Sequence, residues 1–291
     1  NIMKISVSWL KEWIETIPED LSDRLTMAGL EVEGVALAAP AFNGVVVGKV
    51  VELVQHPDAD RLRVAQVDVG RDALVQIVCG APNVAVGIKV PTALVGAVLP
   101  GDFKIKDAKL RGVASSGMLC SAKELGINED ASGLMILADD LAIGADFREL
   151  LDLDDEIIEI DLTPNRGDCL SILGVARDVA AITGQEVKAF EAPVAVVENT
   201  LTKAVTIENT QDCPKYLGRV IEGVNQKAET PLWMCERLRR SGIRPHGILV
   251  DITNYVLLEI GQPLHAFDFA KVTGDIQVRR AKEGEKITLI T

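Results

Sequence analysis

The stretch that decides the fold opens with Val45-Val46-Val47-Gly48-Lys49-Val50-Val51-Glu52-Leu53-Val54 and extends from Phe42 to about Leu137. The β-branched residues of this opening run favour a strand, which the turn-forming residues 56–60 bring to an end. Further strand-like runs follow it along the chain, at Leu62–Val69, Leu74–Cys79, Lys89–Val98 and Phe103–Leu110. Gly, Pro, Asp or Asn bounds each run, which is typical of short antiparallel strands. Five such strands within about a hundred residues predict a small closed barrel, and the five-stranded OB fold is a common barrel of that size.

After the last of these runs, Ser121-Ala122-Lys123-Glu124 has the spacing of a capping box, and Gly126 is suited to end a helix. We therefore expect a short helix there. His56, which begins a Pro-Asp turn, is interpreted as a turn residue, because no Cys or carboxylate stands at a metal-ligand spacing from it.

Four groups of residues in this stretch carry a family resemblance. They are His56-Pro57 with Ala59-Asp60 and Leu62, then Ile77-Val78-Cys79-Gly80-Ala81-Pro82-Asn83, then Lys109-Leu110-Arg111-Gly112, and finally Ser115-Ser116-Gly117-Met118-Leu119-Cys120-Ser121. In this order they resemble the tRNA-binding OB module found in several aminoacyl-tRNA synthetases and their accessory proteins. The resemblance implies RNA contacts along the module, Ser121 included.

The overall charge argues against RNA binding, because the chain has a formal net charge of −13 and nucleic-acid binders usually present a basic face. Locally the sign reverses, since Lys104, Lys106, Lys109 and Arg111 fall close together with only Asp107 opposing them. Such a patch can neutralise several phosphates while acidic surface elsewhere stays away from the RNA. The alternative is a solvated strand edge that lysines protect from pairing.

The segments on either side of this stretch have helical patterns that are too short to bury much surface alone. Ser8 is placed as the cap of a first helix with Trp9 and Trp13 on one face, and Asp168 begins a later helix that Gly184 closes. We predict that residues 3–40 and 151–200 form one discontinuous domain, into which an OB barrel spanning 41–150 is inserted. The acidic run at 152–156 is interpreted as a solvated loop at the return junction, with a metal cluster as the weaker alternative. Trp9, Trp13 and Trp233 are assigned to the core.

Several motifs outside the barrel resemble the β chain family of bacterial phenylalanyl-tRNA synthetase. They are Met3-Lys4-Ile5-Ser6, Thr26-Met27-Ala28-Gly29-Leu30-Glu31-Val32, Thr163-Pro164-Asn165-Arg166-Gly167-Asp168, Gly242-Ile243-Arg244-Pro245, Val250-Asp251-Ile252-Thr253-Asn254-Tyr255 and Gly261-Gln262-Pro263-Leu264-His265-Ala266-Phe267-Asp268. The resemblance implies an α+β multidomain chain in which 201–291 is the first part of an α/β editing (B3/B4-like) domain, truncated by the end of the sequence. The closing run from Ile287 to Thr291 is interpreted as a strand.

The resemblance also implies a function for this last part. A pocket that accepts phenylalanine rejects tyrosine only about a hundredfold, so a second, hydrolytic site must remove tyrosine from mischarged tRNA. His265, Asn254, Thr253 and Arg244 are the residues that the resemblance places around such a site. Taken from the residues alone, His265 is more simply a structural histidine in a Pro-containing turn.

For the parent enzyme, the resemblance implies ATP and Mg²⁺ as cofactors, and an α subunit and tRNA(Phe) as partners in an α2β2 tetramer. It further implies that this part does not aminoacylate by itself, holds no metal or cofactor of its own and is cytoplasmic. The five cysteines include no C-x-x-C pair, so a zinc site or a disulfide framework is not expected. Two other classes stay open: a stand-alone tRNA-binding or RNA-chaperone protein built on the same barrel, and a scaffold whose barrel has no RNA contact.

Overall fold

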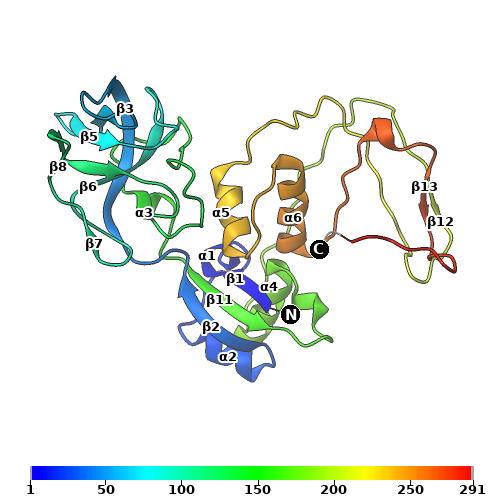
Figure 1. Cartoon of the computed structure of the whole chain (residues 1–291). Helices are drawn as coiled ribbons and strands as arrows, with labels where there is room; N and C mark the ends of the chain where they lie inside the picture. Colours follow the sequence, from blue (N-terminus) through cyan, green and yellow to red (C-terminus); the bar gives the residue numbers. More distant parts are fainter. Residues whose placement is uncertain (1, 290–291) are drawn as a thin grey trace.

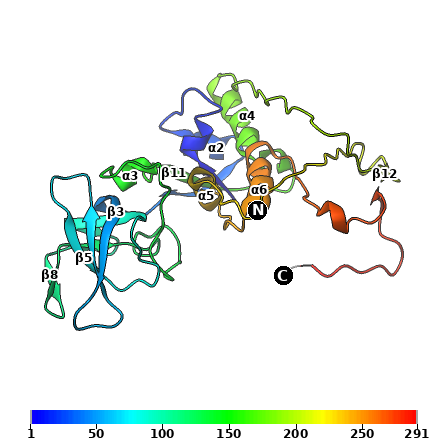
Figure 2. The ribbon, with the colours of Figure 1, turned by 90° about the horizontal axis from the view of Figure 1, so that it is seen from above.

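The structure is a computed structural model that describes residues 2–289. Figure 1 shows three parts side by side: a curled sheet on the left, a small sheet with helices in the middle, and long extended segments on the right. The same separation holds when the molecule is turned, so the curled sheet stands apart from the central helices (Figure 2). The chain combines α and β structure in each of the first two parts.

The curled sheet has the strand order β10-β6-β3-β4-β5, and its two end strands, β5 and β10, also contact each other. Its strands are β3 (Asn43–Gln55), β4 (Arg63–Asp68), β5 (Val75–Cys79), β6 (Lys89–Leu99) and β10 (Gly117–Leu119). All the pairings within this order are antiparallel. The strands predicted at 45–54, 62–69, 74–79 and 89–98 are therefore confirmed, with their ends displaced by a few residues.

The predicted strand Phe103–Leu110 is wrong as a single element. It divides into β7 (Phe103–Lys104), which pairs with β6, and β8 (Ala108–Leu110), which pairs with β9 (Val113–Ser115) instead. Between them the buried Ile105 still donates its N–H to the Ala97 carbonyl, at 2.8 Å, and the chain then leaves the sheet. The basic residues of this run consequently lie on two different elements.

β3 pairs with a strand on each side, and it bends where these pairings shift register. Its pairing with β6 shifts register between Asn43 and Val45, and its pairing with β4 shifts between Val50 and Glu52. Such irregularities increase the local twist and let a strand curl around a core. Gly48 lies at the tightest point, where an added Cβ would stand 2.2 Å from Thr92 Oγ1. Only glycine fits where these strands approach so closely.

The central part is a three-stranded antiparallel sheet whose strands come from before and after the curled sheet in the sequence. Its order is β1-β11-β2, comprising β1 (Ile2–Ser6), β11 (Glu156–Asp161) and β2 (Glu31–Leu37). Three helices contribute to its hydrophobic core, namely α1 (Val7–Leu10), α2 (Leu21–Met27) and α4 (Ile172–Thr183). Ile5, Ile158 and Ile160 are buried in this core, as are the predicted core residues Trp9 and Trp13.

Two helix starts differ from the prediction. Ser6, and not Ser8, caps α1, because its Oγ accepts from the N–H of Trp9 at 3.1 Å. Ser171 caps α4 by accepting from the N–H of Gly174 at 3.0 Å, whereas Asp168 lies in the short 3-10 helix η1 (Gly167–Cys169). In both cases the true cap is the residue whose backbone is extended immediately before the helix. Gly184 ends α4 in the left-handed conformation, as predicted.

The acidic run at 152–156 is not wholly a solvated loop, because Asp155 is buried. Its carboxylate accepts from Ser6 Oγ at 2.5 Å, from the N–H of Ser8 at 2.8 Å and from Arg240 Nη1 at 3.0 Å. Arg240 also bonds Glu236, and both charged side chains are almost fully buried. A buried carboxylate of this kind requires both a cation and hydrogen-bond donors. The run therefore contains the ionic centre of the junction between the sheet and the last part of the chain.

Two crossing segments connect the central sheet to the barrel, and they lie next to each other. The N–H of Ala38, in the outgoing segment, donates to the Asp155 carbonyl in the returning one at 2.8 Å. Arg148, in α3 (Phe147–Leu150), donates to the Ala39 and Pro40 carbonyls and pairs with Asp154. These bonds hold the entry and exit of the barrel together.

The last part of the chain combines two helices with mostly extended backbone. Helices α5 (Leu232–Arg240) and α6 (Ile248–Ile260) pack on the central core through Met234, Leu238 and Leu258. The remaining elements are a parallel pair, β12 (Val205–Ile207) with β13 (Ile276–Val278), and the 3-10 helix η2 (Phe269–Lys271). The strand predicted from Ile287 is absent over residues 287–289, and its other two residues lie outside the described range.

The assignment of Trp233 to the core is wrong. Its side chain remains 52% exposed, and it lies with Trp9 and Tyr255 around the guanidinium of Arg237. The Trp9 and Tyr255 rings stack with centroids 5.1 Å apart, and Trp233 meets Tyr255 edge to face at 5.4 Å. The guanidinium of Arg237 therefore makes cation–π contacts with these three rings at the place where α5 and α6 meet α1.

Candidate nucleic-acid interface

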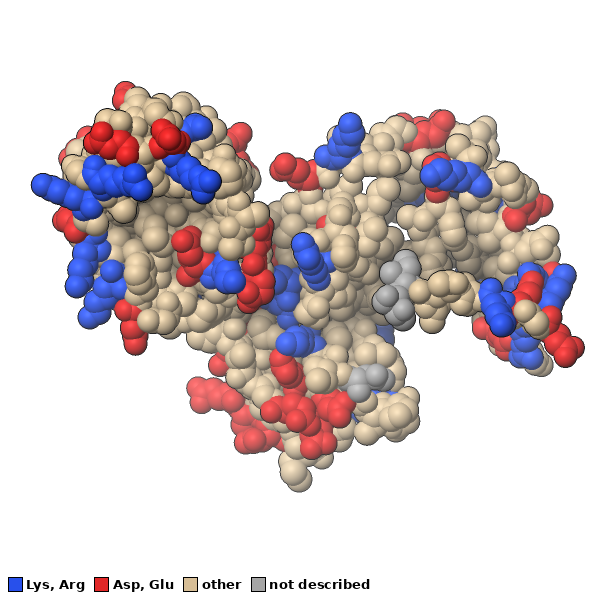
Figure 3. Space-filling view, viewed as in Figure 1, with Lys and Arg blue, Asp and Glu red and all other residues tan. Residues whose placement is uncertain are grey.

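The charges of the molecule are distributed unevenly over its surface. In Figure 3, Lys and Arg side chains gather on the barrel side, whereas Asp and Glu dominate the part formed by β2 and α2. Lys104, Lys106, Lys109 and Arg111 are all exposed, as the patch interpretation requires. Exposed acidic residues of the other surface include Glu19, Asp20, Asp23, Glu31 and Glu33. The net charge of −13 therefore does not describe the barrel face.

The basic residues are carried by β7 and by a hairpin that β8 and β9 form beside the barrel. Lys109 pairs with Ala114 and Leu110 with Val113, so the hairpin turns through two residues, Arg111 and Gly112. Both have positive φ, +47° and +87°. Positive φ at both central residues is the geometry of a type I′ hairpin turn. Arg111 therefore stands at the tip of the hairpin, with Lys109 two residues before it.

The loop at residues 56–62, between β3 and β4, contacts this hairpin. The side-chain amide of Gln55 stabilises the loop by donating to the carbonyls of Ala59, Asp60 and Leu62, at 2.9 to 3.2 Å. Arg111 Nη1 reaches across to the Asp58 carbonyl at 3.3 Å. Arg61 and Arg63, which were not among the predicted RNA contacts, are exposed at the end of this loop and the start of β4. The signal that could have found them is their position shortly after His56-Pro57 in the sequence.

His56 has more contacts than a simple turn residue. Its side chain is buried, its Nδ1 accepts from the N–H of Asp58 at 3.0 Å, and its Nε2 lies 2.9 Å from the Leu110 carbonyl. The first of these bonds belongs to the turn that was predicted. The second joins the turn to the hairpin, which sequence spacing could not show.

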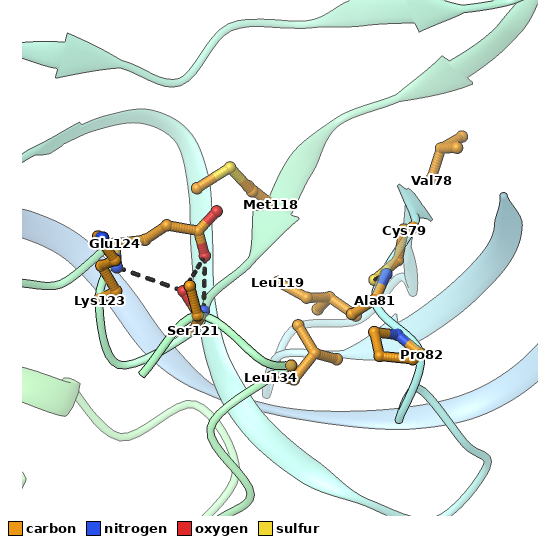
Figure 4. Close-up of a pocket in the computed structure, with 13 residues that line it drawn as sticks. Val78, Cys79, Ala81, Pro82, Met118, Leu119, Ser121, Lys123, Glu124 and Leu134 are labelled. Carbon is orange, nitrogen blue, oxygen red and sulfur yellow. Dashed lines mark hydrogen bonds between the residues drawn. The ribbon is translucent and has the colours of Figure 1, made fainter. Parts of the chain in front are cut away.

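Ser121 lies in a different place, on the rim of a cavity of about 440 Å³ between the loops at 78–82, 118–124 and 131–134 (Figure 4). Its N–H and its Oγ both donate to the Glu124 carboxylate, at 2.6 and 2.8 Å, and its Oγ accepts from the N–H of Glu124. The predicted capping box therefore forms. The predicted helix does not, because residues 122–126 make turns only. With its hydroxyl engaged by a carboxylate, Ser121 offers little to a phosphate.

The other wall of this cavity contains Cys79, whose pKa is raised by burial. Burial also raises the pKa of Cys120, behind the rim, to about 12. A thiol is a nucleophile or a metal ligand only when it loses its proton, and these pKa values disfavour that loss. Neither thiol is therefore suited to act as a nucleophile or a metal ligand at this cavity.

The residues predicted for hydrolysis lie on and around α6. Thr253 and Asn254 are half-buried on the helix, while Arg244 before it and His265 after it are exposed. Thr253 Oγ1 donates to the Val250 carbonyl of its own helix at 2.7 Å, and the ring of His265 lies 6.3 Å from that of Phe267. Within residues 2–289 no hydrogen bond joins any two of these four side chains. Of these four residues, only Thr253 and Asn254 lie side by side, and they are neighbours in the sequence.

One acidic cluster has the composition of a metal site. Oxygen and sulfur atoms of Asp168, Cys169 and Asp178 lie within 4.8 Å of one another. The guanidinium of Arg166 is bonded to all three, however, and so provides the positive charge that a metal would supply. The pKa of Cys169 is raised to about 12, chiefly by burial and then by Asp178. The cluster is best explained as the internal ion pair that shapes the loop at 163–169.

Two family models match the chain. The family described as "Putative tRNA binding domain" matches residues 45–146, and the B3/4 domain family matches residues 212–291. The first match covers the curled sheet together with the hairpin and the loop at 56–62. The second covers α5, α6 and the extended segments.

Curated proteins match almost the full length of the chain. Phenylalanine–tRNA ligase β subunits are 56% identical over 292 residues in Pseudoalteromonas translucida, 57% over 290 residues in Dechloromonas aromatica and 57% over 292 residues in Dickeya dadantii. These alignments cover 99% of this chain in each case. The chain is homologous to phenylalanine–tRNA ligase β subunits. It spans 36% of the length of each of these three relatives.

The likeness to the phenylalanine–tRNA ligase β subunits confirms the family that the motifs indicated. A solved structure, the C-terminal domain of Plasmodium vivax p43, is 23% identical over 35% of this chain and 57% of that chain, with a TM-score of 0.27. That score is too low to support any argument about the fold. No helix among the described residues is both long and apolar enough to span a membrane.

Proposed function

We propose that this chain provides the tRNA-binding module and the beginning of the editing domain of a phenylalanine–tRNA ligase β subunit. The parent reaction joins phenylalanine to tRNA(Phe) with ATP and Mg²⁺, in the cytoplasm and in an α2β2 assembly with an α subunit. The homology at 56–57% identity supports this proposal. So does the order of the two matched domains along the chain.

We infer that the curled sheet is an OB-fold barrel occupying about residues 41–150, inserted between 3–40 and 151–200, and that 201–291 begins the editing domain. The strand order β10-β6-β3-β4-β5, with its end strands in contact, is the order that a closed five-stranded barrel requires. In OB folds the loops between the first two and the last two strands bind oligonucleotides. Here those loops are residues 56–62 and the segment that contains β7 and the β8–β9 hairpin.

The single observation that supports RNA binding most directly is the contact between these two loops, because it gathers exposed basic side chains on one face. Among residues 2–289, none of Lys104, Lys106, Lys109 and Arg111 forms a salt bridge with an acidic side chain, so their charges stay available to phosphates. Phe103 is 58% exposed beside Lys104, and an exposed aromatic ring can stack on a base.

The experiment is tRNA(Phe) binding across a KCl series, with the wild-type chain beside a variant in which Lys104, Lys106, Lys109 and Arg111 are changed to Ala. We expect affinity to fall with salt, and the variant to bind more weakly with a shallower slope, by about 0.7 to 0.9 per lost phosphate contact.

The matched control removes four charges from the last part of the chain instead. Lys227, Lys271, Arg280 and Lys282 are all exposed there, and their replacement by Ala changes the net charge equally. An equal loss of affinity in both variants would contradict the patch and leave only a general charge effect. Absence of wild-type binding would favour the scaffold alternative.

The editing role is the second half of the proposal. His265, Asn254, Thr253 and Arg244 are proposed to recognise and hydrolyse Tyr-tRNA(Phe), with His265 orienting the water or the terminal ribose. The test uses the complete enzyme, α and β subunits together, and measures deacylation of Tyr-tRNA(Phe). General acid–base groups contribute about 10² to 10⁴ in rate, so His265→Ala should slow deacylation at least to the lower end of that range. Unchanged deacylation would remove His265 from the site.

A further inference from the structure

We propose that His56 is a positioning residue for RNA binding, which holds the β8–β9 hairpin and its tip residue Arg111 against the loop at 56–62. This inference rests on the proposed RNA-binding function and assigns within it a residue that touches no RNA. It explains why a buried histidine with both nitrogens engaged stands between the two loops. Figure 2 shows how far the hairpin, labelled β8, extends from the rest of the barrel.

The hydrogen bonds of His56 determine its state. Nδ1 accepts from the backbone N–H of Asp58 at 3.0 Å, so this nitrogen carries no proton. The remaining proton of a neutral imidazole is then on Nε2, which donates to the Leu110 carbonyl at 2.9 Å. With 2% of its surface exposed, the ring has no competing water. One nitrogen therefore holds its own turn while the other holds the last strand residue before the hairpin tip.

Arg111 supplies the reason for holding the tip in place. At φ +47° it occupies the left-handed region, where Gly, Asn or Asp are the usual residues of a two-residue hairpin. A residue other than glycine costs conformational energy at such a position, and strain of this kind is found at ligand-binding and active sites. The guanidinium uses one N–H on the Asp58 carbonyl, at 3.3 Å, and its remaining donors face solvent.

The charges around this contact favour a phosphate backbone as the ligand. Arg61, Arg63, Lys109 and Arg111 are exposed on the two loops, and the acidic residues nearby are Asp58, Asp60 and Asp107, also exposed. Arg111 meets the backbone carbonyl of Asp58 and not its carboxylate. Its charge is thus oriented but not neutralised, which is what a planar, bidentate phosphate contact requires.

The test measures tRNA(Phe) affinity of the chain across a KCl series for His56→Ala, Arg111→Ala and the double variant. If His56 acts through Arg111, each single change lowers the affinity by about threefold to tenfold and the salt slope by about 1. The double variant should then be no weaker than Arg111→Ala alone, because residues that act through one contact are not additive. His56→Gln, which can still donate to the Leu110 carbonyl, should recover part of the loss.

A merely structural histidine would give another pattern. Additive losses in the double variant, or a loss of affinity with an unchanged salt slope, would overturn the proposal. Hydrogen exchange at residues 108–115 provides an independent measurement, and it should rise in His56→Ala and stay low in Arg111→Ala. If His56→Ala does not fold, His56→Gln is compared with the wild type and with Arg111→Ala, and its loss of affinity should be intermediate between theirs. If the wild-type chain does not bind tRNA, both the RNA-binding function and this inference are overturned. If the wild-type chain binds tRNA and His56→Ala binds equally well, only this inference is overturned.

Discussion

The two regions that match known families, residues 45–146 and 212–289, differ in how they bury their apolar residues. In the curled sheet, side chains such as Val47 and Ile77 are completely buried. Val47 lies on β3, which is paired with β6 and β4, and Ile77 lies on the end strand β5, which is paired with β4 and contacts β10. In the second region, Leu217, Phe267 and Ile287 remain 79%, 59% and 84% exposed. The two regions therefore differ in how their strands are paired around a core, and not in whether they contain apolar residues.

The difference extends to the candidate functional residues. In the barrel, Arg111 is oriented by hydrogen bonds that reach it through His56 and Asp58. In the second region, His265 and Arg244 stand in exposed loops without such bonds among the described residues. Its two helices pack on the core of the central sheet, to which α5 contributes Met234 and Leu238 and α6 contributes Leu258. Among residues 2–289, the candidate RNA-binding side chain Arg111 is held by hydrogen bonds beside a packed sheet, whereas the candidate editing side chains His265 and Arg244 are not.

The largest effect is expected at the junction that holds α5 to the central sheet. Arg240→Ala leaves the buried carboxylate of Asp155 without its cation and removes one of the two arginines that pair with Glu236, and breaking a buried pair in this way costs about 3 to 5 kcal/mol. The free energy of unfolding measured in urea should fall by that amount. Hydrogen exchange should rise in α5 and α6 and stay low in the barrel.

The control for this junction is Arg280→Ala, which removes an ion pair with Asp212 that is exposed on the surface. Exposed pairs contribute little, so its stability should be close to that of the wild type. Equal exchange in α5 for both variants would mean that the second region does not depend on the buried junction.

A smaller loss is expected from a cavity inside the barrel. Ile77→Ala removes a fully buried side chain from the core, and such truncations cost about 2 to 5 kcal/mol. Val54→Ala, at a position 60% exposed on β3, should change stability by no more than about 0.5 kcal/mol. Calorimetry that shows only the barrel transition shifting in Ile77→Ala would establish the two regions as separate cooperative units. If all the transitions shift together, the two regions unfold as one cooperative unit.

The cysteines provide a comparison that depends on pH. Burial raises the pKa of Cys120, in the barrel, from its ordinary value of 9.0 to about 12, whereas Cys213 is partly exposed in the second region. Between those two pH values the unfolded chain loses the Cys120 proton and the folded chain keeps it. The free energy of unfolding therefore falls as pH rises from about 9 to 12. At pH 8, iodoacetamide should modify Cys213 and not Cys120, as mass spectrometry of the peptides can show.

The smallest effect is expected at the exposed loop after α6. His265→Ala should alter the stability of the chain by about 0.5 kcal/mol or less, because the side chain is exposed and bonded to none of the described residues. It should also leave tRNA affinity unchanged, unlike Arg111→Ala. A stability loss comparable to that of Ile77→Ala would show that the loop belongs to a core that this structure does not contain.

The strands of the barrel could be predicted because their signals are local. Runs such as Val45–Val54 are β-branched and end at turn residues, so neither their number nor their order needed a tertiary contact. The strand predicted from Phe103 to Leu110 was wrong as a single element, because an alternating residue pattern does not show where the chain changes its pairing strand. The capping box at Ser121 and Glu124 formed its bonds without a helix, and the backbone that follows makes loop bonds instead, such as that from the N–H of Lys123 to the Asp130 carbonyl.

The ionic junction and the His56 contact could not be predicted in the same way. Asp155 was one acidic residue among several, and nothing local distinguishes it from its exposed neighbour Asp154. Its partners Ser6 and Arg240 come from distant parts of the chain. His56 was correctly placed in a turn, but its bond to Leu110 depends on how a hairpin folds back. Buried polar pairs of high sequence separation are determined by topology, which a periodic pattern does not encode.

The bond from Ala38 to Asp155 has a consequence for how the chain folds. β1 and β2 are synthesised before the barrel, but the strand that lies between them, β11, comes after it. If the curled sheet were still unfolded, bringing the two ends of so long a loop together would carry the full closure entropy. A curled sheet that folds first holds its entry and exit as neighbours and leaves only a short gap to close. We therefore expect the central sheet to be the later of the two to form, and mutations that slow folding of the curled sheet to delay it as well.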